Sequence, residues 1–287
     1  MKALFVVNPV SGPKWKNLPK AMMEKIINTP RVEIIETKHA GHASELAKMA
    51  IGEKCESVIA VGGDGTVHEI GTALIGSETA LGIIPMGSGN GYARSMGIPL
   101  NIEKAIEHAL NAKSKRMDTA LVNDRPFLGV AGWGFDAVVA HRFAELKRRG
   151  FANYVKTSMR LVLKYKANAY QIEVNGGQID QKAFSVIAAN TSQFGNNAQV
   201  SPGSVPNDGL LELVIVDPLK LRYIPGMTRR MFNGSIERSK FVRIIKASEF
   251  KIRTENKMAH LDGEPIFLDK EIVVKVVPAS LLVLAGN

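Results

Sequence analysis

Apolar and polar residues follow two different rhythms along the chain. In residues 1 to about 115, short apolar runs alternate with segments whose apolar positions lie three to four residues apart. The runs predict strands and the segments predict amphipathic helices, an order typical of a parallel sheet with crossover helices. The predicted strands are Leu4–Val7, Val32–Ile35, Val58–Val61 and Leu81–Ile84, and the predicted helices are Leu18–Ile27, Ala43–Ala50, Val67–Leu74 and Ile102–Leu110.

From about Leu121 the rhythm changes to strict alternation of apolar and polar residues, which predicts antiparallel sheet. The clearest stretches are Phe241–Ile244, Phe250–Arg253 and Ile272–Val276, with helical segments at Ala137–Lys147, Tyr154–Lys166 and Leu221–Phe232. Asn175-Gly176-Gly177 predicts a hairpin turn, because both glycines accept positive φ. We therefore expect two domains, residues 1–120 and 121–277.

Composition narrows the class of protein. The chain has 287 residues, of which 45% are hydrophobic and 22% are charged, and it has one cysteine, Cys55. These values exclude a disordered chain and a disulfide scaffold, and favour an intracellular globular protein. No apolar run reaches the 18 residues of a membrane-spanning helix. The net charge of +10 favours anionic partners such as nucleotides, nucleic acid or an acidic lipid surface.

Two glycine-rich segments follow successive predicted strands. Gly62-Gly63-Asp64-Gly65-Thr66 leads from a strand into a helix, an arrangement that presents backbone N–H groups to a phosphate. A carboxylate at Asp64 suits such a site when Mg²⁺ lies between it and the phosphates. The second segment, Gly87-Ser88-Gly89-Asn90, offers hydrogen bonds to a nucleotide from Ser88 and Asn90. An ordinary glycine turn explains either segment alone, but in open α/β sheets ligands gather where successive strands end.

Five motifs occur in the order found in the diacylglycerol kinase catalytic-domain family, which includes bacterial lipid kinases and sphingosine kinases. They are Asn8-Pro9-Val10-Ser11-Gly12, Gly62–Thr66, Pro85–Asn90, Asn207–Glu212 and Leu261-Asp262-Gly263-Glu264. The resemblance spans nearly the whole chain. It implies an N-terminal Rossmann-like nucleotide-binding domain of the phosphofructokinase and NAD-kinase type, completed by residues 278–287. It also implies a C-terminal antiparallel β-sandwich with helices, and transfer of the ATP γ-phosphate to a lipid hydroxyl.

The resemblance also implies roles for individual residues. A structural Mg²⁺ is expected at Asp208 with the backbone oxygens of Val205 and Leu210, and the general base is expected at Asp262. The residues implied to contact ATP are Asn8, Pro9, Ser11, Gly12, Thr37, Gly62, Gly63, Asp64, Gly65, Thr66, Ser88, Asn90 and Glu264. Asp64 is predicted to organise metal and phosphates.

Two positions depart from the family pattern. Gly91 stands where bacterial diacylglycerol kinases usually carry Asp, as in the small-residue version of the sphingosine kinases. Val138 stands at the position of the sphingosine kinases' substrate-binding acid, and the nearby acid is Asp136. The resemblance therefore predicts a lipid kinase without naming its acceptor.

Basic residues are concentrated in two segments. Seven Lys and Arg lie between Glu145 and Ala167 against one acid, and ten lie between Leu219 and Arg253 against two. Solvated faces account for such segments equally well, but a lipid kinase without an anchor needs attraction to an anionic surface. We expect a cytoplasmic protein, peripheral at the inner membrane surface, with no nucleic-acid partner and with a homodimer as one possible assembly.

Two other functions compete with the lipid kinase. A kinase of a soluble substrate such as NAD is the nearest, because NAD kinases and phosphofructokinases share the Gly-Gly-Asp-Gly turn. A non-catalytic nucleotide sensor or basic interaction module is the other. The motifs at Asp208 and Asp262 disfavour the first, and the paired glycine segments disfavour the second.

Overall fold

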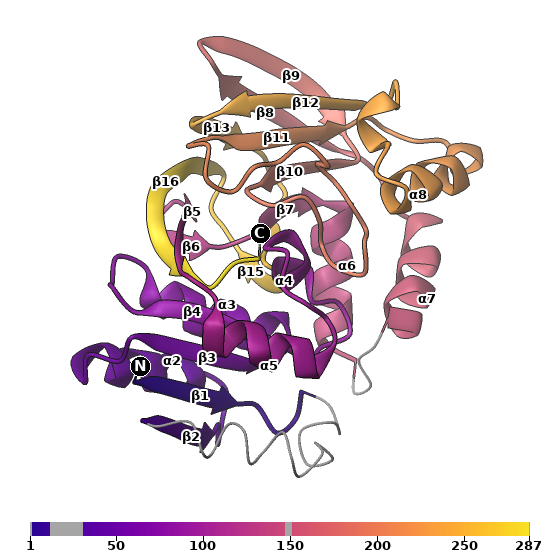
Figure 1. Cartoon of the computed structure of the whole chain (residues 1–287). Helices are drawn as coiled ribbons and strands as arrows, with labels where there is room; N and C mark the ends of the chain where they lie inside the picture. The colour runs from indigo at the N-terminus through magenta and orange to yellow at the C-terminus, as the bar shows by residue number, and fades with distance from the viewer. Residues whose placement is uncertain (1, 12–30, 147–150, 287) are drawn as a thin grey trace. The chain divides into compact units, whose positions relative to one another are not determined.

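The computed structural model describes residues 2–11, 31–146 and 151–286. The chain divides into two compact units (Figure 1). Unit 1 comprises Met1–Met117 and Ala279–Asn287, and unit 2 comprises Asp118–Pro278. The predicted helix Leu18–Ile27 and the predicted site residue Gly12 lie outside the described residues. The domain limits expected from the sequence were residues 120 and 278.

Unit 1 contains a parallel sheet with the strand order β2-β1-β3-β4. The strands are β1 (Ala3–Val7), β2 (Val32–Glu36), β3 (Ser57–Gly62) and β4 (Ala80–Pro85). Every residue of β1, β3 and β4 is buried. Burial on both faces explains why these strands are continuous apolar runs in the sequence.

The helices that accompany this sheet in the described residues are α2 (His42–Gly52), α3 (Asp64–Leu74), α4 (Gly91–Ser95) and α5 (Ile102–Asn111). α5 begins at an Asn101 cap, whose side chain accepts a hydrogen bond from the Lys104 N–H at 3.1 Å. Its apolar stripe, Ala105, Ile106 and Ala109, packs on one face of the sheet together with Phe5 and Ile59. These contacts hold α5 against the sheet of unit 1.

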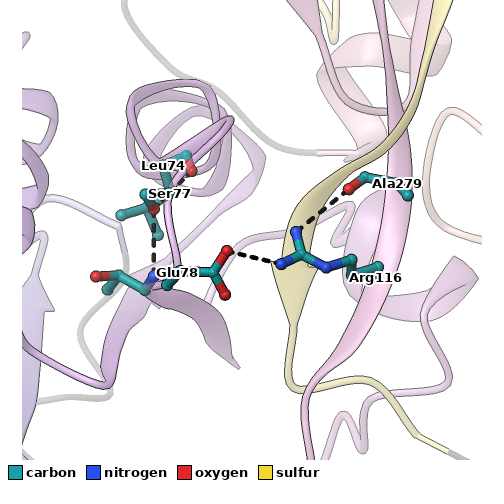
Figure 2. A network of polar contacts seen from close by, with 6 residues as sticks. Leu74, Ser77, Glu78, Arg116 and Ala279 are labelled. Carbon is teal, nitrogen blue, oxygen red and sulfur yellow. Dashed lines mark hydrogen bonds and ion pairs between the residues drawn. The ribbon is translucent and has the colours of Figure 1, made fainter.

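The last residues of the chain complete unit 1. β16 (Glu271–Val283) ends beside β4, where Val283 pairs in parallel with Leu81. Figure 2 shows polar contacts between the segments where the chain leaves unit 1 and where it returns to it. Arg116 forms a 2.7 Å ion pair with Glu78 and donates to the carbonyl of Ala279 at 3.5 Å.

Unit 2 contains two antiparallel sheets that enclose one core. The first has the order β12-β11-β10-β7-β14-β15, and the second contains β9, β8, β13 and the first part of β16. The core between them includes Trp133, Tyr170, Phe127 and Phe250, all almost fully buried. The predicted β-sandwich is therefore confirmed. The strands between β4 and β16 along the chain are β5 (Lys115–Val122), β6 (Arg125–Phe127), β7 (Val130–Gly134), β8 (Asn168–Val174), β9 (Gly177–Ala183), β10 (Ser185–Ala189), β11 (Leu211–Val216), β12 (Val242–Ala247), β13 (Glu249–Arg253), β14 (Met258–Leu261) and β15 (Glu264–Phe267).

The hairpin at Asn175 forms, with one correction to its turn. β8 and β9 pair through Val174 and Gly177, so the turn has two residues, Asn175 and Gly176, with φ of 51° and 74°. Gly177 belongs to the strand, and Asn175 supplies the second positive φ, as Asn does in type I′ turns.

Helices cover the outer faces of unit 2. They are α6 (Phe135–Ala144), α7 (Phe151–Val162) and α8 (Ile224–Phe232), with short 3₁₀ turns η1 (Leu221–Tyr223) and η2 (Ile236–Arg238). α7 packs beside α6, as Figure 1 shows. Met227 of α8 and Ile236 of η2 join Val214 in a second apolar cluster.

Candidate functional site

The predicted nucleotide residues of unit 1 lie at the carboxyl ends of the parallel strands. Asn8 to Ser11 follow β1, Thr37 follows β2, Gly63 to Thr66 follow β3, and Gly87 to Asn90 follow β4. The strands run in one direction, so these loops share one edge of the sheet. The Thr37 N–H donates to the carbonyl of Val7 at 2.8 Å, which places the loops after β1 and β2 side by side.

The turn after β3 is a helix N-terminus built from glycine. Gly63 caps α3 in an extended conformation without a side-chain cap, and its carbonyl accepts from the Val67 N–H at 3.1 Å. The first N–H groups of α3 have no acceptor within the helix, and the helix dipole favours an anion there. Asp64, the first helical residue, is partly exposed at the same point. A carboxylate beside an anion-binding terminus suits a cation that bridges it to phosphate oxygens.

The two glycine loops contact each other through their backbones. A Cβ on Gly87 would lie 2.7 Å from the Cα of Gly63, and a Cβ on Gly63 would lie 3.2 Å from the Cα of Gly87. Gly62 is similarly restricted, since its Cβ would lie 2.5 Å from the Thr66 Oγ1. A side chain at Gly63 or Gly87 would push the two loops apart, so these glycines explain how two phosphate-type loops fit at neighbouring strands.

Two asparagines brace these loops through side-chain hydrogen bonds. The Asn90 Oδ1 accepts from the Gly87 N–H at 3.0 Å and its Nδ2 donates to the Gly87 carbonyl at 2.9 Å. The Asn8 Nδ2 donates to the Thr66 Oγ1 at 3.0 Å and its Oδ1 accepts from the Val10 N–H at 3.0 Å. The structure thus brings Asn8 and Thr66, both predicted to contact ATP, into contact with each other. Ser88 is exposed on the second loop, with no loop-bracing bond among the contacts described.

In unit 2, the Asp262 carboxylate binds a backbone loop. Its Oδ1 accepts from the N–H groups of Gly129 at 2.7 Å and Val130 at 3.0 Å, and its Oδ2 accepts from the Leu128 N–H at 2.8 Å. Asp262 adopts a positive φ of 49°, and its own N–H donates to the carbonyl of Val130 at 2.8 Å. The carboxylate is therefore held in one orientation and organises residues 128–130. Glu264, predicted to contact the nucleotide, is exposed at the start of β15.

A buried acid–histidine pair lies next to this turn. The His260 Nε2 lies 3.0 Å from the Asp136 Oδ2, and both side chains are buried. The Gly263 N–H donates to the His260 Nδ1 at 3.3 Å, so Nδ1 is the acceptor and Nε2 carries the proton. A Cβ on Gly132 would lie 1.8 Å from the Asp136 Oδ2, so glycine is required there. The pair holds the turn that contains Asp262.

The segment predicted to bind structural Mg²⁺ is occupied by protein groups. The Lys246 Nζ lies 3.0 Å from the Asp208 Oδ2 and 3.3 Å from the Glu212 Oε1. The Asp208 Oδ1 accepts from the Leu210 N–H at 3.0 Å, and the Val205 carbonyl accepts from the N–H groups of Asn207 and Asp208. The hydrogen bond to Asp208 raises the pKa of the Lys246 ammonium. As arranged, these groups do not fit a cation, because the Lys246 ammonium takes its place beside Asp208 and the Val205 carbonyl already accepts two N–H groups.

Sequence reasoning missed two buried polar residues that support these segments. The Asn190 Nδ2 donates to the carbonyls of Asp118 at 2.9 Å and Leu128 at 2.7 Å. The Asp118 Oδ2 accepts from the Gly209 N–H at 2.7 Å. Asn190 directly follows the fully buried β10, and a polar residue ending such a run is the only signal the sequence offers.

Within residues 2–11, 31–146 and 151–286, no group of three or more His, Cys, Asp and Glu could hold a metal ion. The same ranges contain no helix long and apolar enough to cross a membrane.

Two family models match the chain in succession. Residues 2–122 match the diacylglycerol kinase catalytic domain, and residues 129–285 match the YegS C-terminal NAD kinase beta sandwich-like domain. The chain belongs to the diacylglycerol kinase catalytic-domain family. The resemblance inferred from the five motifs is therefore confirmed.

Individual relatives agree with this family. A probable lipid kinase YegS-like from Pectobacterium atrosepticum is 31% identical, with 84% of this chain and 82% of that protein aligned. A probable lipid kinase YegS-like from Klebsiella pneumoniae is 30% identical, with 93% of this chain and 92% of that protein aligned. A diacylglycerol kinase from Bacillus subtilis is 27% identical, with 92% of this chain and 89% of that protein aligned.

The fold of the family is also found in a solved structure. A diacylglycerol kinase crystal structure from Bacillus anthracis superposes with a TM-score of 0.78 at 22% identity, covering 100% of this chain and 97% of that one. At this identity the likeness concerns the fold alone.

Proposed function

We propose that the protein is a lipid kinase that transfers the γ-phosphate of Mg·ATP to a hydroxyl group of a membrane lipid. One observation carries the proposal: the two glycine loops meet backbone to backbone, through Gly63 and Gly87, at the N-terminus of α3. This geometry suits the phosphate chain of a nucleotide, and family membership supplies the kinase class.

In the proposed reaction, unit 1 binds the nucleotide. Phosphoryl transfer depends on positioning and charge neutralisation more than on covalent catalysis. The N–H groups at the start of α3 bind phosphate oxygens, and Asp64 supports a Mg²⁺ that arrives with ATP. Such a cation needs only one or two protein carboxylates when phosphates supply other ligands. Asn8 and Asn90 hold the loops in place.

Unit 2 is proposed to present the base. The Asp262 carboxylate is oriented by three backbone N–H groups, and a general base must lie in a fixed position beside the hydroxyl it deprotonates. Its observed contacts support a role in organising residues 128–130, and the catalytic role is part of the proposal.

A lipid acceptor is supported by the relatives and by charge. Proteins 30% and 31% identical carry the description probable lipid kinase, and the chain has a net charge of +10. We place the reaction at the cytoplasmic surface of the inner membrane, where the surface carries anionic lipids.

The test is transfer of γ-³²P from Mg·ATP to one acceptor at a time. Diacylglycerol, monoacylglycerol, sphingosine and phosphatidylglycerol are offered separately in mixed micelles, and NAD is offered in solution. We expect one lipid to be labelled, and we expect Asp64→Asn to abolish labelling at temperatures at which the variant is folded. Asp64 suits this control better than Asp262, whose substitution also disturbs residues 128–130.

Labelling of NAD instead of any lipid would establish a soluble-substrate kinase and contradict the proposal. ATP binding without transfer to any acceptor would favour a nucleotide sensor.

A further inference from the structure

One helix of unit 2 exposes a stripe of large apolar side chains. Val155, Met159 and Leu163 are 41%, 57% and 66% exposed, and they follow one another at four-residue intervals along α7 and the turn after it. Residues four apart lie about 40° apart around a helix, so Val155 and Met159 share one strip, and Leu163, the first residue after the helix, extends the exposed apolar surface. Three large apolar residues on one exposed surface form a patch, whereas single exposed apolar residues are ordinary.

A stripe of cations runs beside the apolar one. Lys156, Arg160 and Lys164 are exposed and each directly follows a residue of the apolar stripe. Consecutive residues lie about 100° apart around a helix, so the cations line one border of the apolar strip along its whole length. Within the described part of α7 and its following turn, residues 153 to 164, no acid interrupts this stripe.

The C-terminal end of the helix and the residues after it are anchored in unit 2. Val162 is buried, and the ring of Tyr165 packs against the rings of Phe135 at 5.3 Å and Phe184 at 5.2 Å. The Asn168 Nδ2 donates to the Tyr165 hydroxyl at 2.9 Å. Burial raises the pKa of Tyr165 well above its usual range. These contacts hold the end of α7 against unit 2, while both stripes remain exposed.

We propose that α7 docks the protein on an anionic lipid bilayer, lying in the interface with its apolar stripe among the acyl chains and its cations at the head groups. An apolar face bordered by Lys and Arg is the pattern of interfacial helices. A second copy of the chain is a poorer occupant, because a two-fold contact through this stripe would bring six cations close together. The inference rests on the proposed membrane-lipid acceptor and supplies the surface by which the enzyme reaches it.

The experiment measures co-sedimentation of the full chain with vesicles of phosphatidylcholine alone or mixed with phosphatidylglycerol. We expect binding to the mixed vesicles only, reduced by salt. Lys156→Gln, Arg160→Gln and Lys164→Gln together should weaken binding about 100-fold, since each basic residue contributes about fivefold. Met159→Gln with Leu163→Gln should weaken it roughly tenfold.

A matched control removes the same charge from unit 1. Lys48→Gln, Lys104→Gln and Lys113→Gln replace three exposed lysines outside α7, and we expect them to change binding less than fivefold. Equal losses in both triple variants would show a diffuse effect of net charge and overturn the proposal. Unchanged binding of the Met159 and Leu163 variant would also overturn it.

Two further measurements separate the alternatives. A dimer in sedimentation velocity that Met159→Gln dissociates would show that the stripe is a homodimer interface and contradict membrane docking. Phosphotransfer to lipid in detergent micelles distinguishes the two proposals, because α7 variants should retain it. Vesicle binding without phosphotransfer would overturn the proposed function alone.

Discussion

Replacing Asp262 by Asn should destabilise unit 2 in addition to any effect on catalysis. The carboxylate accepts three backbone hydrogen bonds, at 2.7, 2.8 and 3.0 Å, from residues 128–130. An amide side chain keeps one acceptor oxygen, so if Oδ1 is retained the Leu128 N–H faces an NH₂ group. The hydrogen bond from Leu128 is then lost, and the hydrogen bonds from Gly129 and Val130 go to a neutral amide oxygen instead of a carboxylate.

The size of this effect follows from the hydrogen bonds. Bonds to charged groups contribute about 1.5–3 kcal/mol and neutral ones about half as much. Asp262 is half-buried, so water replaces part of the loss, and we expect the free energy of unfolding to fall by about 2–4 kcal/mol. For a unit of this size the melting temperature should fall by about 5–15 °C.

Differential scanning calorimetry measures this difference, and Asp269→Asn is the matched control. Asp269 is an exposed acid of the same unit, and its substitution should change stability by less than about 0.5 kcal/mol. An Asp262→Asn variant that melts with the wild-type protein would refute the structural role. A loss of phosphotransfer well below the melting temperature, larger than the unfolded fraction explains, would support Asp262 as the base.

Three further predictions concern separate parts of the molecule. Gly87→Ala should weaken ATP binding about tenfold in calorimetric titration, because its Cβ would displace the neighbouring loop, whereas Gly52→Ala, with open space around its Cβ, should not. Lys246→Met should make stability depend on Mg²⁺, raising the melting temperature by about 3–6 °C at tenfold excess over the dissociation constant; an equal response of the wild type would show that Lys246 does not replace a cation. Burial raises the pKa of Tyr170, so the neutral phenol stabilises the fold below pH about 10 and this stability is lost as pH rises further. Tyr170→Phe should flatten that decline in urea titrations, by up to about 1.4 kcal/mol per pH unit, and an unchanged slope would contradict it.

The buried strands and the glycine turns of unit 1 could be predicted from short stretches of sequence. The continuous apolar runs of β1, β3 and β4 were recognisable because both their faces are buried. The sequence predicted Gly63 and Gly87 in two phosphate-binding turns, and only the structure shows that the two turns contact each other there.

Contacts between residues that are far apart along the chain could not be predicted from the sequence. The Asp262 carboxylate reaches N–H groups more than 130 residues away, and only the pairing of β14 with β7 brings them together. Lys246 meets Glu212 because these residues are directly opposite in β12 and β11, a register that alternation alone does not specify. The contacts of Asp262 and Asp208 therefore had to come from the structure.

The most direct test of the account is one reaction that offers both acceptor classes to the enzyme. Mg·[γ-³²P]ATP is incubated with a total lipid extract in vesicles and with NAD in the same tube, and the label is partitioned between chloroform and water. The account predicts chloroform-soluble label that Asp64→Asn removes. Label confined to the aqueous phase as phosphorylated NAD would contradict the assignment of a lipid acceptor.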